Sequence, residues 1–311
     1  MISFKRILVA KDFSVCSKRA LEFGTRLAKD AGADLHVIHI QVLHENALQG
    51  EMTQNTLENL DQTLADWIGP VPGVCVTRVV QREISAAPAI VRYAKENACD
   101  VIVVGTHGRR GFRQAILGSV AEEVVRTASC AVLAVHGGDQ ESLLTPGLDS
   151  EILLPIDFSA RAAQTIPIAR EIAASMGAGL RVLHVVEESL RPAFYMAGAF
   201  ALHDMQPDIE ERAMAQLRDL YGRSDGPDVP VEFEVILGHA VTEISASAFE
   251  NEATMIVMST HGLRGLAHFF LGSVAERVIR LATCPVLTLR VPGSAEQALN
   301  ERELDHANTE A

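Results

Sequence analysis

An internal duplication limits the folds available to this chain more than any other feature of its sequence. The segment 101–135, VIVVGTHGRRGFRQAILGSVAEEVVRTASCAVLAV, returns at 255–289 as MIVMSTHGLRGLAHFFLGSVAERVIRLATCPVLTL, 154 residues further on. The two copies share 19 of 35 positions, whereas unrelated segments of average composition would share roughly two or three. The chain is therefore built from two repeats of one structural unit.

Each copy has the pattern of a strand, a turn, a helix and a second strand. In the first copy, the apolar run Val101–Val104 predicts a short strand that is buried on both faces. Glycines follow at Gly105 and Gly108, where they permit positive φ or the close approach of another group. Leu117–Ser119 then opens an amphipathic helix, and Ala131–Val135 predicts the second strand.

A strand end, glycines and a helix N-terminus together predict an anion site. The first amides of a helix have no acceptor within the helix, and the helix dipole favours negative charge there. The basic segment with Arg109, Arg110 and Arg113 is compatible with binding one polyphosphate. The alternative is purely structural, because Ser119 and Ser273 each begin an S-x-x-E capping box, which would by itself explain both serines.

The spacing of the glycines adds a resemblance to a known family. The first copy reads Gly105-x2-Gly108-x9-Gly118-Ser119, which is neither a Walker P-loop nor a Rossmann fingerprint. It resembles the nucleotide-binding motif of the universal stress protein family, G-x2-G-x9-G-[S/T]. The second copy reads Ser259-x2-Gly262-x9-Gly272-Ser273, with serine in place of the first glycine.

The resemblance also implies roles for residues outside this motif. Asp12 and Asp157 each lie in a D-F-S turn after the first strand of a repeat. The pattern alone leaves helix capping and ligand contact equally open for Asp12, whereas in the family this aspartate lies by the adenosine part of the nucleotide. The resemblance further places Ile40 and Val185 in the adenine pocket, Val104 beside the sugar, and Gly238 in a small-residue loop beside the nucleotide. Counting back from the following helix puts Ile84 at the position of Gly238 in the first repeat.

The phosphates and their metal complete the implied site. The backbone amides and hydroxyls expected to hold the phosphates belong to both copies of the motif: Gly105, Gly108, Arg109, Gly118 and Ser119, and Ser259, Gly262, Gly272 and Ser273. The implied ligand is ATP or a related adenine nucleotide, accompanied by Mg²⁺, which usually binds through substrate oxygens.

The order of strands and helices predicts the fold class. Each repeat alternates strand and helix, so its sheet should be parallel and doubly wound with right-handed crossovers. The resemblance implies two open sheets of about five strands in the order 3-2-1-4-5, related by a pseudo-twofold, with the last strands at Ala131–Val135 and Pro285–Val291 pairing with each other. The expected domains are residues 1–137 and 151–292, with a linker at 138–150 and a mobile acidic tail at 293–311.

Three local features carry further expectations. His39 and His184, at the same place in an apolar strand of each repeat, are expected to be hydrogen-bonded core residues. Pro167 should kink the first helix of the second repeat or delay its start. The apolar block Ala193–Leu202, in an insertion of the second repeat, is expected to cover the core edge or to form a subunit contact.

Composition excludes several classes of function. A net charge of −13 argues against a broad nucleic-acid surface and against binding to anionic membranes. The longest apolar run, Ala193–Leu202, is too short to span a bilayer. Five dispersed cysteines without CxxC spacing, and an N-terminus without a signal-peptide pattern, predict a cytoplasmic protein.

Three functions remain open from the sequence. The first is a stress-response protein that binds an adenine nucleotide, acts through its nucleotide-bound state on an unidentified protein partner, and can form a homodimer. The second is a nucleotide-free interaction module whose repeats build a dimer platform. The third is a slow ATPase, for which Arg109 and Arg113 could bind phosphate but for which the motif offers no acidic metal ligand.

Overall fold

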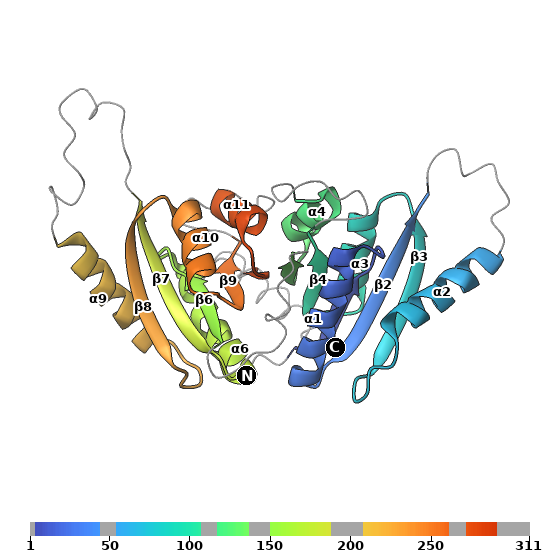
Figure 1. The fold of residues 1–311 in the computed structure, drawn as a ribbon, viewed down its shortest axis with the longest axis horizontal. Helices are drawn as coiled ribbons and strands as arrows, with labels where there is room; N and C mark the ends of the chain where they lie inside the picture. The colour runs from blue at the N-terminus through green and yellow to red at the C-terminus, as the bar shows by residue number, and fades with distance from the viewer. Residues whose placement is uncertain are drawn as a thin grey trace, which may run out of the picture.

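A computed structural model describes residues 4–43, 54–106, 117–136, 150–187, 208–260 and 272–290, and for residues 54–58 it describes the backbone alone. Within these ranges the two repeats form two similar halves that lie side by side (Figure 1). The halves have the same order of strands and helices, as the duplicated sequence predicts.

The first half alternates strands and helices along the chain. Its elements are β1 (Arg6–Ala10), α1 (Val15–Ala31), β2 (Asp34–Val42), α2 (Gln54–Ile68), β3 (Val76–Glu83), α3 (Ala86–Glu96), β4 (Val101–Gly105), α4 (Ser119–Thr127) and β5 (Ala131–Val135). Helix α1 is capped at its N-terminus by Ser14, whose hydroxyl accepts the Ser17 amide, and at its C-terminus by Gly32 in the left-handed conformation.

The second half repeats this order with one interruption. Its elements are β6 (Glu151–Pro155), α5 (Ala160–Ala163), α6 (Thr165–Met176), β7 (Gly179–Glu187), α9 (Ile209–Gly222), β8 (Val231–Gly238), α10 (Ala240–Glu250), β9 (Met255–Ser259), α11 (Ser273–Leu281) and β10 (Val286–Leu289). The counterpart of α1 is broken between Ala163 and Thr165. Pro167 explains the break, because it has no N–H for the carbonyl of Ala163 and its ring clashes with that carbonyl.

All strands in the described ranges belong to one ten-stranded sheet in the order β3-β2-β1-β4-β5-β10-β9-β6-β7-β8. Each half has the predicted order 3-2-1-4-5 and is parallel throughout. The two expected sheets are thus halves of one sheet, joined by the antiparallel pair β5 and β10. Leu133 pairs with Leu287, which is its own equivalent in the second repeat, so the pseudo-twofold passes through this pair.

Side chains reinforce the junction between the two halves. The hydroxyl of Thr288 donates to the carbonyl of Val132 at 3.1 Å, and His136 Nε2 donates to the carbonyl of Ile279 at 2.6 Å. Arg280 of α11 forms an ion pair with Glu122 of α4 at 3.3 Å. These contacts place α4 and α11 next to each other across the pseudo-twofold, as Figure 1 shows.

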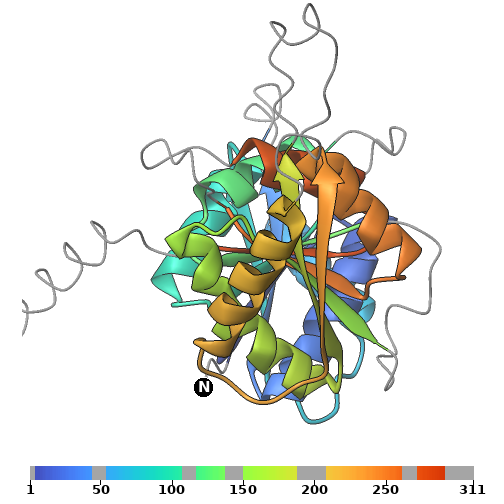
Figure 2. The ribbon, with the colours of Figure 1, turned by 90° about the vertical axis from the view of Figure 1, so that its left-hand side faces the viewer.

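Helices cover both faces of the sheet, and a separate apolar core lies under each layer. The first core contains the side chains of Ile7, Val9 and Leu35 and packs against α1 and α2, with the equivalent residues of the second half under α6 and α9. The second core contains Leu8, Ile102 and Val132 and packs against α3 and α4, and again its equivalents lie under α10 and α11. Figure 2, which looks from the β8 edge, shows α9 and α10 on opposite sides of the sheet.

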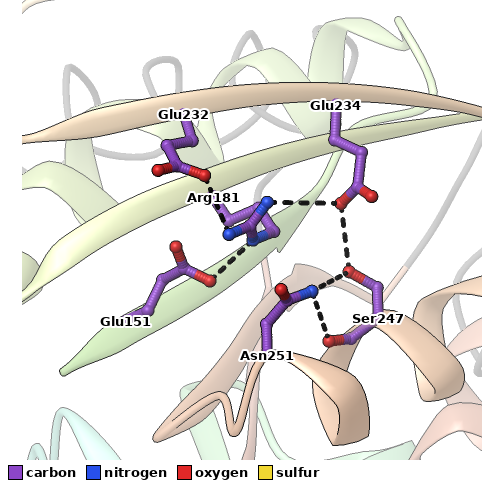
Figure 3. A network of polar contacts seen from close by, with 6 residues as sticks. All are labelled: Glu151, Arg181, Glu232, Glu234, Ser247 and Asn251. Carbon is purple, nitrogen blue, oxygen red and sulfur yellow. Dashed lines mark hydrogen bonds and ion pairs between the residues drawn. The ribbon is translucent and has the colours of Figure 1, made fainter. Parts of the chain in front are cut away.

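A polar network joins β6, β7, β8 and α10 in the second half, near the amino ends of the strands (Figure 3). Arg181 of β7 lies between three carboxylates, with Nε 2.7 Å from Glu151, Nη2 2.8 Å from Glu232 and Nη1 3.8 Å from Glu234. Glu234 in turn accepts a hydrogen bond from Ser247 of α10 at 3.1 Å. In the first half, the equivalent of Arg181 is His36, which bonds Tyr93 Oη at 2.8 Å.

Candidate functional site

The candidate site lies where β1 and β4 end side by side. Chain connections leave these two adjacent strands in opposite directions, so their carboxyl ends form the crevice where open α/β sheets bind ligands. Val9 pairs with Val103, which brings the residues after Ala10 next to Gly105 and Thr106. β6 and β9 have the same relation in the second half, through Ile152 and Leu153 of β6.

The D-F-S turns position the two aspartates at this edge. Asp12 Oδ1 accepts hydrogen bonds from the amide and the hydroxyl of Ser14 at 2.9 and 2.6 Å. Asp157 Oδ1 accepts the amide of Ser159 at 3.0 Å. The helix caps are the serines, because Ser14 accepts the Ser17 amide and Ser159 the Ala162 amide. Neither aspartate is the cap of its helix.

The residue after each aspartate is held in a strained backbone conformation. Phe13 and Phe158 have φ of 64° and 60°, a left-handed region that bulky residues rarely adopt. Their rings pack on His39 and His184, with centroids 4.6 and 4.0 Å apart. Nδ1 of each histidine bonds the carbonyl before its aspartate, at 2.7 Å in the first repeat and 2.6 Å in the second. The prediction of a hydrogen-bonded core residue is confirmed for His39, which is buried, whereas His184 is hydrogen-bonded but only partly buried.

Three apolar site residues lie on the α3 and α10 side of the sheet. Ile40 and Val185 are partly buried against the second core. Val104 is 4% exposed in that core, so its side chain is buried there. Ile40 pairs with Gln81 of β3, and Val185 with Ile236 of β8.

The N-termini of α4 and α11 form the other end of the site. Gly118 and Gly272 are the N-caps, and each donates its amide to the threonine after the preceding strand, Thr106 at 2.7 Å and Thr260 at 2.8 Å. The amides left for an anion are therefore those that follow, beginning with Ser119 and Ser273. Both serines are exposed.

The capping-box interpretation is wrong in both repeats. The helices begin at Ser119 and Ser273, one residue earlier than a capping box requires, and no side chain bonds the amides at either cap. Gly118 has φ −63° and ψ 142°, a conformation open to any residue. Capping therefore does not explain Ser119, and the backbone conformation of Gly118 does not by itself require glycine.

Gly105 has a structural explanation of its own. A Cβ built there would lie 2.9 Å from the carbonyl carbon and from the Cβ of Cys16, and 3.0 Å from the Ser17 amide. Glycine therefore lets the first turn of α1 pack against the end of β4. Ser259 stands at this position in the second repeat, where the corresponding helix is broken into α5 and α6.

The position of Gly238 differs from the one expected by counting. Sheet pairing puts Glu187 opposite Gly238 and Val42 opposite Glu83, so Glu83 is the equivalent of Gly238. Ile84 is an additional loop residue, 85% exposed. It does not fill the place of the small residue, because the first repeat has one residue more between this strand and the next helix.

Three predicted site residues, Gly108, Arg109 and Gly262, lie outside the described residues, as does the apolar block at 193–202. The remaining predicted residues gather at the carboxyl edge of their own repeat. Each half thus presents an aspartate turn, an apolar strand end and a helix N-terminus along one edge.

Comparison with known proteins assigns the family. The model of the universal stress protein family matches residues 3–136 and again 150–290. The chain belongs to the universal stress protein family. A universal stress protein of Mycolicibacterium smegmatis is 28% identical over 303 residues, which cover 91% of this chain and 96% of that protein. The universal stress protein MJ0531 of Methanocaldococcus jannaschii is 31% identical over 145 residues, 47% of this chain and 84% of that protein.

Solved structures show the same fold. A universal stress protein from Archaeoglobus fulgidus superposes with a TM-score of 0.63 at 21% identity, covering 93% of this chain and 99% of that one. A putative universal stress protein from Pseudomonas aeruginosa gives a TM-score of 0.63 at 20% identity, covering 93% and 94%. The fold expected from the resemblance, a tandem universal stress protein, is confirmed.

Sequence reasoning missed a cation beside the first aspartate of this universal stress protein. Lys11, directly before Asp12, is 3% exposed, and its Nζ lies 3.9 Å from the centre of the Trp67 ring in α2. Burial lowers the pKa of Lys11 to about 8. Comparison of the two repeats could have indicated this burial, because the apolar residue Ile156 occupies the position of Lys11 in the second repeat.

Two of the cysteine thiols are kept protonated by burial. All five cysteines are free. Burial raises the pKa of Cys130 and of Cys284 to about 12, so both thiols stay protonated. No helix in the described part of the chain has the length and apolar character needed to cross a membrane.

Proposed function

We propose that this universal stress protein binds ATP or a related adenine nucleotide in each repeat and acts through its nucleotide-bound state. The observation that carries the proposal is the pair of helix N-termini at Ser119 and Ser273. Their first amides have no acceptor among the described residues, and their serine hydroxyls are not used as caps. Such a helix end attracts phosphate through its amides and dipole.

The rest of each edge fits the remainder of a nucleotide. Asp12 and Asp157 would meet the ribose or base at the carboxyl edge of each repeat, where the strands that carry Ile40 and Val185 also end. Mg²⁺ would be held mainly through phosphate oxygens, and the described residues contain no cluster of histidine, cysteine and acidic side chains that would bind it independently. The five free cysteines fit the reducing cytoplasm proposed for the protein.

A thermal-shift assay with ATP, AMP and cyclic AMP tests the ligand class. A nucleotide at about 100 times its dissociation constant should stabilise the folded state by roughly 2.7 kcal/mol. Absence of a shift with all three would support the nucleotide-free interaction module instead.

Serine substitutions test the position of the phosphates. Because Ser119 and Ser273 are exposed and are not caps, Ser119→Ala and Ser273→Ala should leave the free energy of unfolding within about 0.5 kcal/mol of the parent. Loss of a hydrogen bond to a charged phosphate should weaken ATP binding in the altered repeat by roughly tenfold or more. ATP binding that survives in the double variant would place the phosphates elsewhere.

Glycine substitutions give an independent test of phosphate binding at the N-termini of α4 and α11. Gly118→Val and Gly272→Val should each abolish binding in one repeat, because the side chain would occupy the space beside the first amides. We expect the first repeat to be the tighter site, since it has glycine at 105 where the second has Ser259. Loss of the stronger binding event in Gly272→Val would reverse this order.

A further inference from the structure

The side chain of Lys11 is a buried cation that the fold does not explain. Its Nζ is buried and has no hydrogen-bond partner within the described part of the chain. Lysine is almost never fully buried without a partner, because an ammonium loses its hydration there. The counterpart Ile156 shows that an apolar side chain fits the same place in the fold. Packing alone therefore does not explain why a lysine occupies position 11.

The geometry around Lys11 fixes its ammonium next to the turn that carries Asp12. The Lys11 amide continues the sheet by donating to the carbonyl of Ile38 at 2.8 Å, and the Lys11 carbonyl accepts from His39. Phe13 packs on both His39 and Trp67, the latter with ring centroids 5.6 Å apart. The aromatic face of Trp67 supplies a favourable cation–π contact for the ammonium.

The charged groups that act on Lys11 come from its own turn and from α1. Asp12 and Glu22 favour its protonated form, and Lys18 opposes it. The electrostatic interaction acts in both directions, so the Lys11 cation offsets part of the negative potential of Asp12. An anionic ligand that approaches Asp12 therefore meets less repulsion than the aspartate alone would cause.

We propose that Lys11, held against Trp67, is a positioning residue that tunes the first-repeat site toward anionic nucleotides by offsetting the charge of Asp12. This inference rests on the proposed function of the same site. It concerns the first repeat alone, because the second has Ile156 at this position.

A comparison of two ligands tests the charge effect. ATP and uncharged adenosine are titrated calorimetrically into the full-length chain carrying Gly272→Val, with and without Lys11→Ile. We expect Lys11→Ile to weaken ATP binding about five- to tenfold and to leave adenosine binding unchanged. Lys11→Arg, which keeps the cation, should restore most of the ATP affinity. Lys29→Ile removes the same charge from the exposed end of α1 and should change neither affinity.

Two results of this comparison would overturn the inference. Equal weakening of ATP and adenosine would indicate a purely structural role for Lys11, and unchanged ATP affinity would indicate no role. Failure of the proposed function gives a different result, since the protein without any substitution at Lys11 or Gly272 would then bind neither ligand.

The dependence of binding on pH gives a second readout. Since the pKa of Lys11 is about 8, ATP affinity of the first repeat should fall as pH rises through this value, and the Lys11→Ile and Lys11→Arg variants should lack this fall. Trp67 is the only tryptophan in the chain, so its fluorescence reports on the first repeat. Its emission should change with a midpoint near pH 8 in the parent and not in Lys11→Ile. An emission that is flat with pH in the parent would contradict a lowered pKa of Lys11 beside Trp67.

Discussion

Replacement of Gly105 by alanine tests the packing of α1 against the end of β4. The added Cβ would lie 2.9 Å from two carbon atoms of Cys16 and 3.0 Å from the Ser17 amide, where ordinary contacts are 3.4–4 Å. Two of these three atoms belong to the backbone, so no side-chain rotation relieves the clash. The start of α1 must instead move by roughly 0.5–1 Å in a close-packed environment.

The expected loss of stability follows from two opposing terms. Overpacking of this kind costs about 1–3 kcal/mol. Gly→Ala also restricts the unfolded chain, which stabilises the folded state by about 0.4–1 kcal/mol. We therefore expect Gly105→Ala to lower the free energy of unfolding by about 1–2 kcal/mol, measured by urea denaturation without nucleotide.

The same substitution at Gly179 is the matched control. Gly179 begins β7, and a Cβ there would have no neighbour closer than 3.5 Å. Gly179→Ala should therefore leave the free energy of unfolding unchanged or raise it by up to about 1 kcal/mol. If both variants were equally stable, the explanation of Gly105 by helix packing would be refuted.

Three further predictions concern other parts of the molecule. Lys11→Ile should raise the free energy of unfolding at pH 7 by about 1–3 kcal/mol, because it removes a buried charge. Between about pH 8 and 10.5 the folded parent has released the Lys11 proton, whereas its unfolded chain still binds it. The free energy of unfolding of the parent should therefore rise with pH relative to that of the variant, as urea denaturation across this range would show. Arg181→Met should destabilise the protein by about 1–3 kcal/mol, since Glu151 and Glu234 lose their shared cation. Arg212→Met, which breaks an exposed pair with Asp208, should change stability by less than about 0.5 kcal/mol. Equal losses of stability in the two variants on thermal melting would contradict a stabilising role for the Arg181 network. Proteolytic cleavage within 138–150 should leave the halves associated through β5 and β10, and separation into two monomeric fragments on size-exclusion chromatography would count against this.

The sequence predicts the fold of this protein well because its strands are short apolar runs between clear turns. Strand β5 has the predicted bounds, Ala131–Val135, and β4 extends one residue beyond its apolar run. Strand β3 extends to Glu83, three residues beyond the apolar pair that ends at Val80, because pairing with β2 continues through polar residues. Hydrophobicity marks burial, whereas strand length depends on a neighbour that the local pattern does not contain.

Details of the site were less predictable for the same reason. The choice between Ser119 and Gly118 as helix cap depends on a hydrogen bond to Thr106 that brings the chain into the helix one residue earlier. The equivalence of Gly238 with Glu83 depends on sheet register, which a count from the next helix misses. The burial of Lys11 depends on Trp67, which lies on a helix 56 residues further along the chain.

The pairing of Leu133 with Leu287 has a consequence for how the two sites can diverge. In a symmetric dimer of identical chains, every substitution occurs in both subunits and must suit both. Here one polypeptide supplies both partners, so association does not weaken on dilution, and each half can change alone. The two repeats differ in this way at two positions, where Lys11 corresponds to Ile156 and Gly105 to Ser259. The central pair of the interface, Leu133 and Leu287, is the same residue in both repeats. A protein of this form can combine two unequal sites in a fixed ratio of one to one.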